Sequence, residues 1–155
     1  MLIRGLQPED SDALWQIRNS EPVRALSNDP TPIPRDRHDA WFVRYMANPE
    51  NHCEILEENG IVVGYCRVDA ALVSIALRPE AQGRGFGRAL LRTAITHTQG
   101  RWPRLIAEVR HGNEVSLRLF LGAGFNVAQD DGSKYVLEYL FDAEHTSSSG
   151  DAPVN

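Results

Sequence analysis

The sequence predicts a mixed α/β fold, in which a mostly antiparallel sheet of about seven strands carries helices on both faces. Strand-like runs flank the Asn59-Gly60 pair, and Asn-Gly between such runs is the strongest short signal for a β-hairpin. A second hairpin is predicted across Asp130-Asp131-Gly132. Between the two hairpins, a β-branched strand, a glycine-rich loop, a helix and a further strand form one βαβ unit, so the predicted sheet is mixed.

The predicted elements follow one another in the order β-α-α-β-β-β-α-β-α-β-β. A short strand begins the chain, and Asp10 or Ser11 can cap the first helix, whose apolar residues recur at helical spacing. Three prolines between residues 28 and 34 fix φ and remove backbone donors, so this segment is predicted to be a loop. The second helix carries a cluster of aromatic side chains and ends at Asn48-Pro49. The expected ranges for this part of the chain are 2–6, 11–19 and 35–47.

The second part of the chain alternates strands and helices. The segment 104–110 alternates, which places Leu105, Ala107 and Val109 on one face of a strand and Glu108 on the other. Asn113 opens the next helix, which the glycines at residues 122–124 end. The expected ranges here are 53–57, 61–68, 71–77, 86–98, 104–110, 113–121, 125–128 and 135–141.

Composition indicates one globular domain and excludes several classes of protein. Of 155 residues, 42% are hydrophobic and 24% charged, and the net charge of −5 argues against a nucleic-acid partner. Without a membrane-length apolar run or a signal peptide, we expect a cytoplasmic protein with no membrane partner. Cys53 and Cys66 lack metal or redox spacing and are predicted to be core residues; no metal site is predicted. We expect one domain over 1–141 and a disordered, Ser/Gly/Pro-rich tail over 142–155.

The glycine-rich segment Gln82–Arg88 carries the strongest functional signal. It follows a strand and opens a helix, so its backbone N–H groups lie where the helix dipole favours an anion such as a pyrophosphate. A tight strand-to-helix turn is the purely structural alternative. A Walker loop is excluded because the segment has no lysine, and a dinucleotide motif lacks its third glycine at Arg88. The upstream antiparallel hairpin also does not suit a dinucleotide-binding fold.

Two motifs together resemble the GNAT N-acetyltransferase superfamily. The segment Gln82-Gly83-Arg84-Gly85-Phe86-Gly87 is similar to its Q/R-x-x-G-x-G/A signature, and residues 113–125 resemble its N-x-x-A/S-x-x-L-Y/F-x-x-x-G-F helix. The resemblance extends over residues 2–141. It implies the GNAT fold, acetyl-CoA as the acetyl donor with CoA as the product, and transfer of the acetyl group to a primary amine.

The resemblance also implies which residues bind acetyl-CoA. The backbone of Ile75, Ala76 and Leu77 would pair with the pantetheine amides like an added strand. Asn113 matches the family asparagine that contacts the cofactor arm, although asparagine is also a preferred N-cap residue. The full set of implied cofactor contacts is Ile75, Ala76, Leu77, Gln82, Gly83, Arg84, Gly85, Phe86, Gly87, Arg88, Asn113, Ser116 and Phe120.

Acid–base chemistry has one candidate base and no assigned acid. Glu108 lies where several similar enzymes carry a catalytic glutamate, and it would take the amine proton directly or through water; a solvated or salt-bridged glutamate is the alternative. Phe120 stands where many family members have tyrosine, and a phenyl ring cannot protonate the departing thiolate. Possible replacements are Tyr135, Tyr139, Ser116 or a water, and unassisted departure is also open.

Arg18, His38 and Trp41 are the candidate acceptor residues. With the sequence around them, including Val23-Arg24 and Asn48-Pro49, they resemble the amino-sugar N-acetyltransferases of the pseudaminic-acid pathway. That resemblance implies a nucleotide-linked amino sugar, since arginines suit phosphate and an aromatic ring suits a sugar or base. Trp41 is equally expected in the core stripe of its helix, and His38 is expected to hydrogen-bond locally. The alternatives are a peptide or protein N-terminus as acceptor, or a non-catalytic acyl-CoA-binding module. A monomer and a homodimer are both compatible with the sequence.

Overall fold

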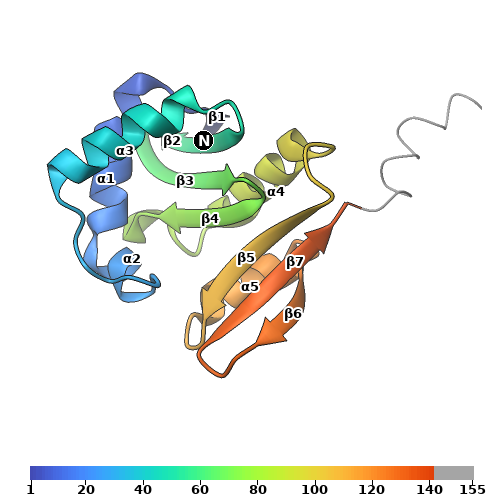
Figure 1. The fold of residues 1–155 in the computed structure, drawn as a ribbon. Helices are drawn as coiled ribbons and strands as arrows, with labels where there is room; N and C mark the ends of the chain where they lie inside the picture. The colour runs from blue at the N-terminus through green and yellow to red at the C-terminus, as the bar shows by residue number, and fades with distance from the viewer. Residues whose placement is uncertain (142–155) are drawn as a thin grey trace, which may run out of the picture.

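A computed structural model describes residues 1–141, and the tail predicted over 142–155 lies outside the described residues. Seven strands form a single sheet in the order β1-β2-β3-β4-β5-β7-β6 (Figure 1). Neighbouring strands are antiparallel except for β4 and β5, which confirms the predicted mixed sheet. The strands are β1 Leu2–Gly5, β2 Asn51–Glu58, β3 Ile61–Asp69, β4 Leu72–Leu77, β5 Arg104–Arg110, β6 Asn126–Asp130 and β7 Lys134–Leu140.

Helices cover both faces of the sheet, as predicted. Successive residues of β2 point to opposite faces: Ile55 packs in the core formed with α1 and α3, and Leu56 in the core formed with α4 and α5. A short helix at residues 21–25 was not predicted; it begins with Pro22 in its first turn, a position that suits the fixed φ of proline. The helices are α1 Ser11–Asn19, α2 Glu21–Ala25, α3 Arg35–Ala47, α4 Phe86–Thr98 and α5 Glu114–Gly122, with 3₁₀ turns at Pro8–Asp10 and Pro79–Ala81.

Local contacts confirm one turn prediction and correct one capping prediction. Asn59 and Gly60 join β2 to β3 with φ values of 54° and 79°, the left-handed pair that a two-residue hairpin requires. Asp10 does precede α1, but its carboxylate makes no cap bond to that helix. It accepts hydrogen bonds from Arg4 and from the backbone N–H of Gln7 instead. The Asp10 carboxylate is therefore held by Arg4 and by the N–H of Gln7, and the N-terminus of α1 does not bind it.

The parallel strands β4 and β5 separate soon after they meet. Their register contains only the pairs Leu72 with Ile106 and Val73 with Ala107. Beyond Val73 the two strands diverge (Figure 1), while β5 remains paired with β7 along its whole length. Among residues 1–141, no strand pairs with β4 from Ser74 onward on this side. The backbone of Ile75, Ala76 and Leu77 therefore borders an opening in the sheet.

The two cysteines are core residues, as predicted. Both are free and buried, and burial raises the pKa of the Cys53 thiol to about 12 and that of Cys66 well above its ordinary value. They are therefore thiols in neutral solution and pack as small apolar groups.

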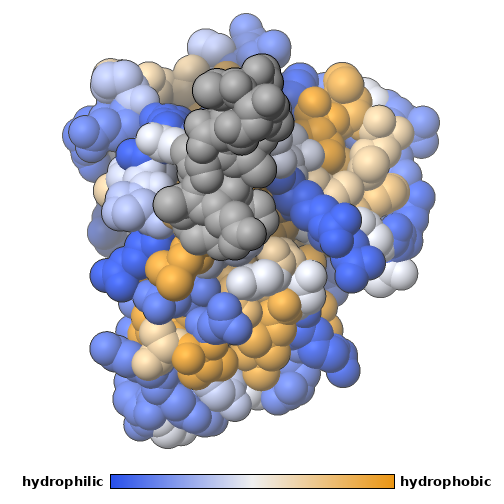
Figure 2. Space-filling view, turned by 90° about the vertical axis from the view of Figure 1, so that its right-hand side faces the viewer, coloured by the Kyte–Doolittle hydropathy of each residue, from blue (hydrophilic) through white to orange (hydrophobic). Residues whose placement is uncertain are grey.

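The outer end of the sheet is an exposed edge. All five residues of β6 are exposed, and Figure 2 shows hydrophobic side chains on the lower half of this face, where β6, β7 and α5 lie in Figure 1. The choice between a monomer and a homodimer stays a prediction.

Within the described residues, no helix is both long enough and apolar enough to cross a membrane.

Candidate active site

The glycine-rich loop presents free backbone donors at the start of α4. Gly83 and Gly85 have φ values of +73° and +81°, and a Cβ atom on either would meet nothing within 4 Å. The first helical hydrogen bond runs from the N–H of Ala89 to the carbonyl of Gly85, at 3.3 Å. The backbone N–H groups of residues 83–88 donate no hydrogen bond to any residue within 1–141. Free donors at a helix N-terminus form a site for an anion, and this loop fits a pyrophosphate.

Gly87 differs from Gly83 and Gly85 because side chains lie close to the position of a Cβ atom there. A Cβ atom at Gly87 would lie 3.5 Å from the side chains of both Leu119 and Leu77. These distances are ordinary van der Waals contacts, so the packing of α4 on α5 and β4 would accept a small side chain at this position.

The charged side chains of the loop are not equally available. Arg84 forms two hydrogen bonds with the carboxylate of Glu58, at 2.9 and 2.5 Å, and its guanidinium lies 4.5 Å from the centre of the Phe86 ring. Arg88 forms no ion pair within residues 1–141. The side chain of Gln82 turns back and donates to the carbonyl of Leu77 at 3.3 Å. Arg88 is thus the loop cation better placed to add charge to an anion.

A cleft of about 320 Å³ occupies the region where β4 and β5 separate, and we call it the splay cleft. It brings together residues from β4, β5 and α5 that lie far apart in the sequence. Leu77 and the loop Gln82–Arg88 do not line it. The predicted site residues that do line it are Arg18, Ile75, Ala76, Glu108, Asn113, Ser116 and Phe120.

Glu108 projects from β5 into the splay cleft, on the face opposite Leu105 and Ala107. Its Oε1 accepts a hydrogen bond from the side-chain amide of Asn28 at 3.0 Å and lies 3.3 Å from Nζ of Lys134. The carboxylate is therefore held in place by the loop after α2 and by β7. It remains accessible, with about a third of its side chain exposed (32%).

Asn113 and Phe120 mark the two ends of the α5 surface in this cleft. The side chain of Asn113 accepts a hydrogen bond from the N–H of Ser116 at 3.3 Å, which confirms its role as N-cap of α5. Phe120 is buried and packs edge-on against Phe125, with ring centroids 5.0 Å apart. Its ring thus closes the cleft with an apolar wall.

Two of the hydroxyl groups considered as general acids lie elsewhere. Tyr135 stacks on His111 and Tyr139 packs against Phe125, and neither lines the splay cleft. Ser116 does line it, as does Tyr65, which sequence reasoning missed. Tyr65 pairs with Ala76 across β3 and β4, so its place in the hairpin register was the signal that could have found it. Burial raises the pKa of Tyr65 and keeps its hydroxyl protonated.

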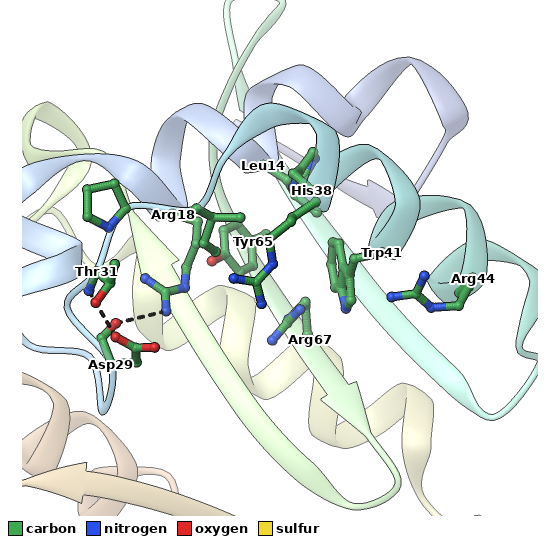
Figure 3. A pocket seen from close by; sticks show the side chains of 12 residues that line it. Leu14, Arg18, Asp29, Thr31, His38, Trp41, Arg44, Tyr65 and Arg67 are labelled. Carbon is green, nitrogen blue, oxygen red and sulfur yellow. Dashed lines mark hydrogen bonds between the residues drawn. The ribbon is translucent and has the colours of Figure 1, made fainter.

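A second cavity of about 400 Å³ adjoins the cleft and is rich in arginine; we call it the arginine pocket. Figure 3 shows Arg18 from α1, Trp41 from α3 and Arg67 from β3 around the same space. The guanidinium of Arg67 lies 4.9 Å from the centre of the Trp41 ring. Nη1 of Arg18 and Nε of Arg67 are buried and have no hydrogen-bond partner within residues 1–141. Buried donors without partners are costly, so this pocket is suited to an acceptor of hydrogen bonds.

His38 also lines the arginine pocket, and its hydrogen bond reaches α1 and not its own helix, where a local bond was expected. Its Nε2 donates to the backbone carbonyl of Ser11 at 2.8 Å. Burial lowers its pKa, so the ring is neutral near pH 7. Sequence reasoning missed Arg37, Arg44 and Arg67; alternation along β3 could have placed Arg67 beside Tyr65, whereas nothing in the sequence singled out the other two.

The arginine pocket and the splay cleft are adjacent and share several lining residues. Arg18, Asp29, Tyr65 and Arg67 line both of them. One molecule can therefore occupy the arginine pocket and reach Glu108 in the cleft. The structure brings Arg18, His38 and Trp41 together in the pocket and joins them to the predicted donor side through these shared residues.

Comparison with known proteins is consistent with this geometry. The model of the acetyltransferase (GNAT) domain matches residues 1–126. The chain is 30% identical over 141 residues to the L-amino acid N-acyltransferase MnaT of Escherichia coli, covering 82% of this chain and 80% of that protein. It is 34% identical over 95 residues to the N-alpha-acetyltransferase RimI of Mycobacterium tuberculosis, covering 56% and 59%. The structure of yncA from Salmonella typhimurium with acetyl-CoA has a TM-score of 0.80 at 24% identity, covering 92% and 94%. The chain belongs to the GNAT acetyltransferase family and is an acetyl-CoA-dependent N-acetyltransferase.

Proposed function

We propose that this enzyme acetylates the primary amine of a small acceptor that also carries a negatively charged group. The observation that carries the proposal is the pair of buried, unpartnered guanidinium atoms, Nη1 of Arg18 and Nε of Arg67, beside the splay cleft. A carboxylate or phosphate would supply the missing hydrogen-bond acceptors. Hydrogen bonds to a charged group contribute about 1.5–3 kcal/mol each, so such an acceptor gains affinity and a fixed orientation.

The charge of the arginine pocket favours an anion over a cation. Four arginines line it, Arg18, Arg37, Arg44 and Arg67, against one carboxylate, that of Asp29. The Asp29 side chain accepts a hydrogen bond from the N–H of Thr31, which holds its pKa below the ordinary value. Because His38 is neutral, the pocket keeps a positive balance near pH 7. A polyamine would meet this field with its own positive charges and bind poorly.

The donor is bound on the other side of the opening. Acetyl-CoA supplies the activated acetyl thioester. The N–H groups of residues 83–88 would bind its pyrophosphate, with Arg88 adding charge. The unpaired edge of β4 at Ile75, Ala76 and Leu77 would hold the pantetheine amides, because no strand of residues 1–141 pairs with its N–H and C=O groups on that side.

Glu108 is the group proposed to take the proton from the acceptor amine. An ammonium ion is not a nucleophile, so the amine must lose a proton before or during attack on the thioester. Glu108 lies in the cleft and carries one of the carboxylates that line it. The proton passes to Glu108 directly or through a water. Of the side chains considered as general acid for the departing thiolate, Ser116 lines the same cleft.

Two relatives favour different acceptors for the same chemistry. MnaT is named for L-amino acids, whose carboxylate suits the arginine pocket. RimI is named for N-alpha-acetylation, which corresponds to the peptide or protein N-terminus considered from the sequence. A nucleotide-linked amino sugar would present a diphosphate to the same arginines. We favour the free amino acid, because its amine and its carboxylate are close together and the pocket and the cleft share walls.

A panel of amines compared at equal concentration tests this function. The panel contains free L-amino acids, their methyl esters, a nucleotide-linked amino sugar, spermidine and an N-terminal alanine peptide, and the readout is acceptor-dependent release of CoA thiol. We expect an amino acid to be turned over at least about tenfold faster than its methyl ester, which lacks the charge. Equal rates for acid and ester would refute the anionic acceptor. Turnover of the nucleotide sugar or peptide alone would assign the acceptor to that source.

Gly85→Val tests the donor loop separately from the acceptor. Valine at φ +81° strains the loop and moves the N–H groups that surround it, so we expect the KM for acetyl-CoA to rise about tenfold or more. Gly100→Val is a matched control, because Gly100 has φ +87° and an equally open Cβ direction after the end of α4. The control shares the strain and should leave KM unchanged. An unchanged KM in Gly85→Val would remove the loop from the donor site.

A further inference from the structure

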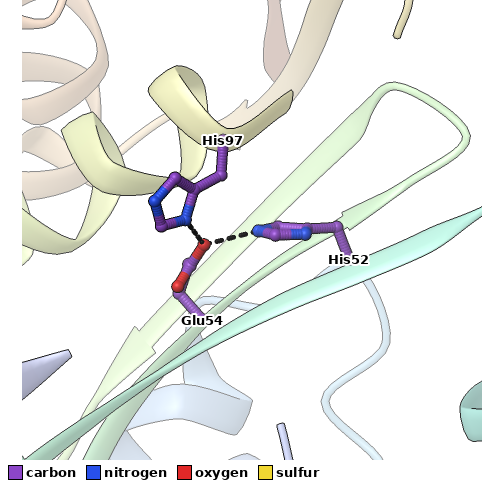
Figure 4. A group of neighbouring side chains, drawn as sticks. All are labelled: His52, Glu54 and His97. Carbon is purple, nitrogen blue, oxygen red and sulfur yellow. Dashed lines mark hydrogen bonds and ion pairs between the residues drawn. The ribbon is translucent and has the colours of Figure 1, made fainter. Parts of the chain in front are cut away.

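Three side chains outside the active site converge on one point. In Figure 4 both imidazole rings point at the same carboxylate oxygen of Glu54. Nε2 of His52 lies 2.5 Å from Oε2, and Nδ1 of His97 lies 2.6 Å from it. His97 on α4 lies 43 positions after Glu54 on β2, so no local motif creates this cluster. The three ligand atoms lie within 4.8 Å of one another.

The cluster contains a buried carboxylate without a permanent cation. The Glu54 side chain is only 2% exposed, and no lysine or arginine within 1–141 forms an ion pair with it. Burial would raise the pKa of Glu54, but the hydrogen bonds from His52 and His97 outweigh burial and hold the pKa below its ordinary value. The described side chains therefore offer this buried carboxylate two imidazoles and no fixed cation.

We propose that His52, Glu54 and His97 bind one zinc ion. Two imidazole nitrogens and a carboxylate oxygen are the donor set of many zinc sites, with water in the fourth position. The ion would replace both imidazole protons that now point at Glu54 and would give the carboxylate a permanent positive partner. In a tetrahedral zinc site neighbouring ligand atoms lie about 3.3 Å apart, so the imidazoles must move back slightly. His97, 55% exposed in the last turn of α4, has room to do so.

The position of the cluster places the proposed ion away from the acetyl-transfer site. His52 and Glu54 lie on the same face of β2 as Leu56, which packs in the core formed with α4. Arg67 pairs with Cys53 on the opposite face, where the arginine pocket lies. The sheet thus separates the proposed zinc from the acetyl-transfer site. The ion would tie the end of α4 to β2 and take no part in the reaction.

Zinc binding to the full chain, freed of metal and of any histidine tag, tests the proposal. Isothermal titration with zinc should give one ion per chain, and His52→Ala and His97→Ala should each weaken binding by more than about tenfold. Saturating zinc should raise the melting temperature of the parent by about 5 °C or more and leave that of His97→Ala unchanged. Acidification should weaken binding, because protons compete for the ligands.

A matched control separates the cluster from an ordinary surface pair. His111 lies 2.7 Å from Asp130 and forms a pair of one histidine and one carboxylate, so His111→Ala should bind zinc like the parent. Because His97 is largely exposed, its alanine variant is expected to fold, and circular dichroism checks this. No zinc binding in the micromolar range, or binding that His52→Ala and His97→Ala leave intact, would overturn the proposal. The cluster would then be a hydrogen-bonded network alone.

Discussion

Replacing Glu108 by glutamine is expected to lower kcat by about 100-fold or more, while the KM for acetyl-CoA changes little. General-base catalysis typically contributes about 10²–10⁴-fold, and glutamine keeps the size and polarity of the side chain without its basicity. The substitution should leave the fold intact, because Glu108 lies on the exposed face of β5 and the residues of that strand in the core are Leu105, Ala107 and Val109. Steady-state kinetics with the best acceptor of the panel measures the effect.

The pH profile gives this prediction a second, independent readout. In Glu108→Gln the general base is gone and only the acceptor amine governs how the rate depends on pH, so the pH profile should differ in shape from that of the parent. Glu138→Gln is the matched control. Glu138 lies opposite Ile106 on β7, pairs with Arg104 at 3.0 Å, and lies outside both cavities. A kcat within about threefold of the parent in Glu108→Gln would contradict the base assignment.

A mutation of Asn28, the hydrogen-bond partner of Glu108 in the loop after α2, separates a positioning role of Glu108 from its role as a base. The carboxylate accepts a hydrogen bond from Asn28, so a mutation at Glu108 also releases the loop that borders both cavities. Asn28→Ala breaks the same contact and keeps the carboxylate. If Asn28→Ala loses as much activity as Glu108→Gln and keeps the pH profile of the parent, Glu108 positions the loop. If Asn28→Ala is nearly as active as the parent, the carboxylate itself carries the effect.

The conformation of the glycine-rich loop was predictable from the sequence because its signals are local. A strand, a glycine-rich loop and a helix start follow one another within residues 71–91, and backbone conformation alone determines what they present. Positive φ at Gly83 and Gly85 is what glycine at those positions predicts. The free edge of β4 at Ile75, Ala76 and Leu77 was expected from the GNAT resemblance and is confirmed among residues 1–141; these segments alone do not predict it, because pairing between strands depends on register.

The arginine pocket could be predicted only in fragments because it is assembled from distant segments. Arg18 on α1, Trp41 on α3 and Arg67 on β3 meet only after the sheet has formed, and each is ordinary in its own local sequence. The same holds for Arg84, whose pairing with Glu58 across 26 positions removes a charge that the loop motif alone would assign to the anion. Side-chain pairing over long range is information that periodicity and composition do not contain.

Arg67→Gln is expected to lower kcat/KM for the anionic acceptor by about 10–150-fold, with little change in the KM for acetyl-CoA. That range corresponds to one lost hydrogen bond to a charged group, about 1.5–3 kcal/mol. Arg67 stacks on Trp41 and Tyr45, and its side chain is only 23% exposed, so the guanidinium is held in the pocket before the acceptor arrives. Arg67→Lys keeps the charge but loses the planar donors and the stacking. Its kcat/KM for the anionic acceptor should lie between those of the parent and of Arg67→Gln.

The controls for Arg67→Gln must separate charge recognition from packing. Arg92→Gln removes an exposed arginine on α4 that lines neither cavity, and should leave kcat/KM for the acceptor unchanged. The decisive comparison is between an amino acid and its methyl ester in the same variant: Arg67→Gln should reduce the preference for the acid, because the lost interaction is with the carboxylate. An equal loss for acid and ester would mean that Arg67 only shapes the pocket. Arg67→Gln also removes the ion pair between Arg67 and Asp69, whose nitrogen and oxygen lie 3.6 Å apart. That loss affects acid and ester alike, so the ratio of the two rates reports on the acceptor itself.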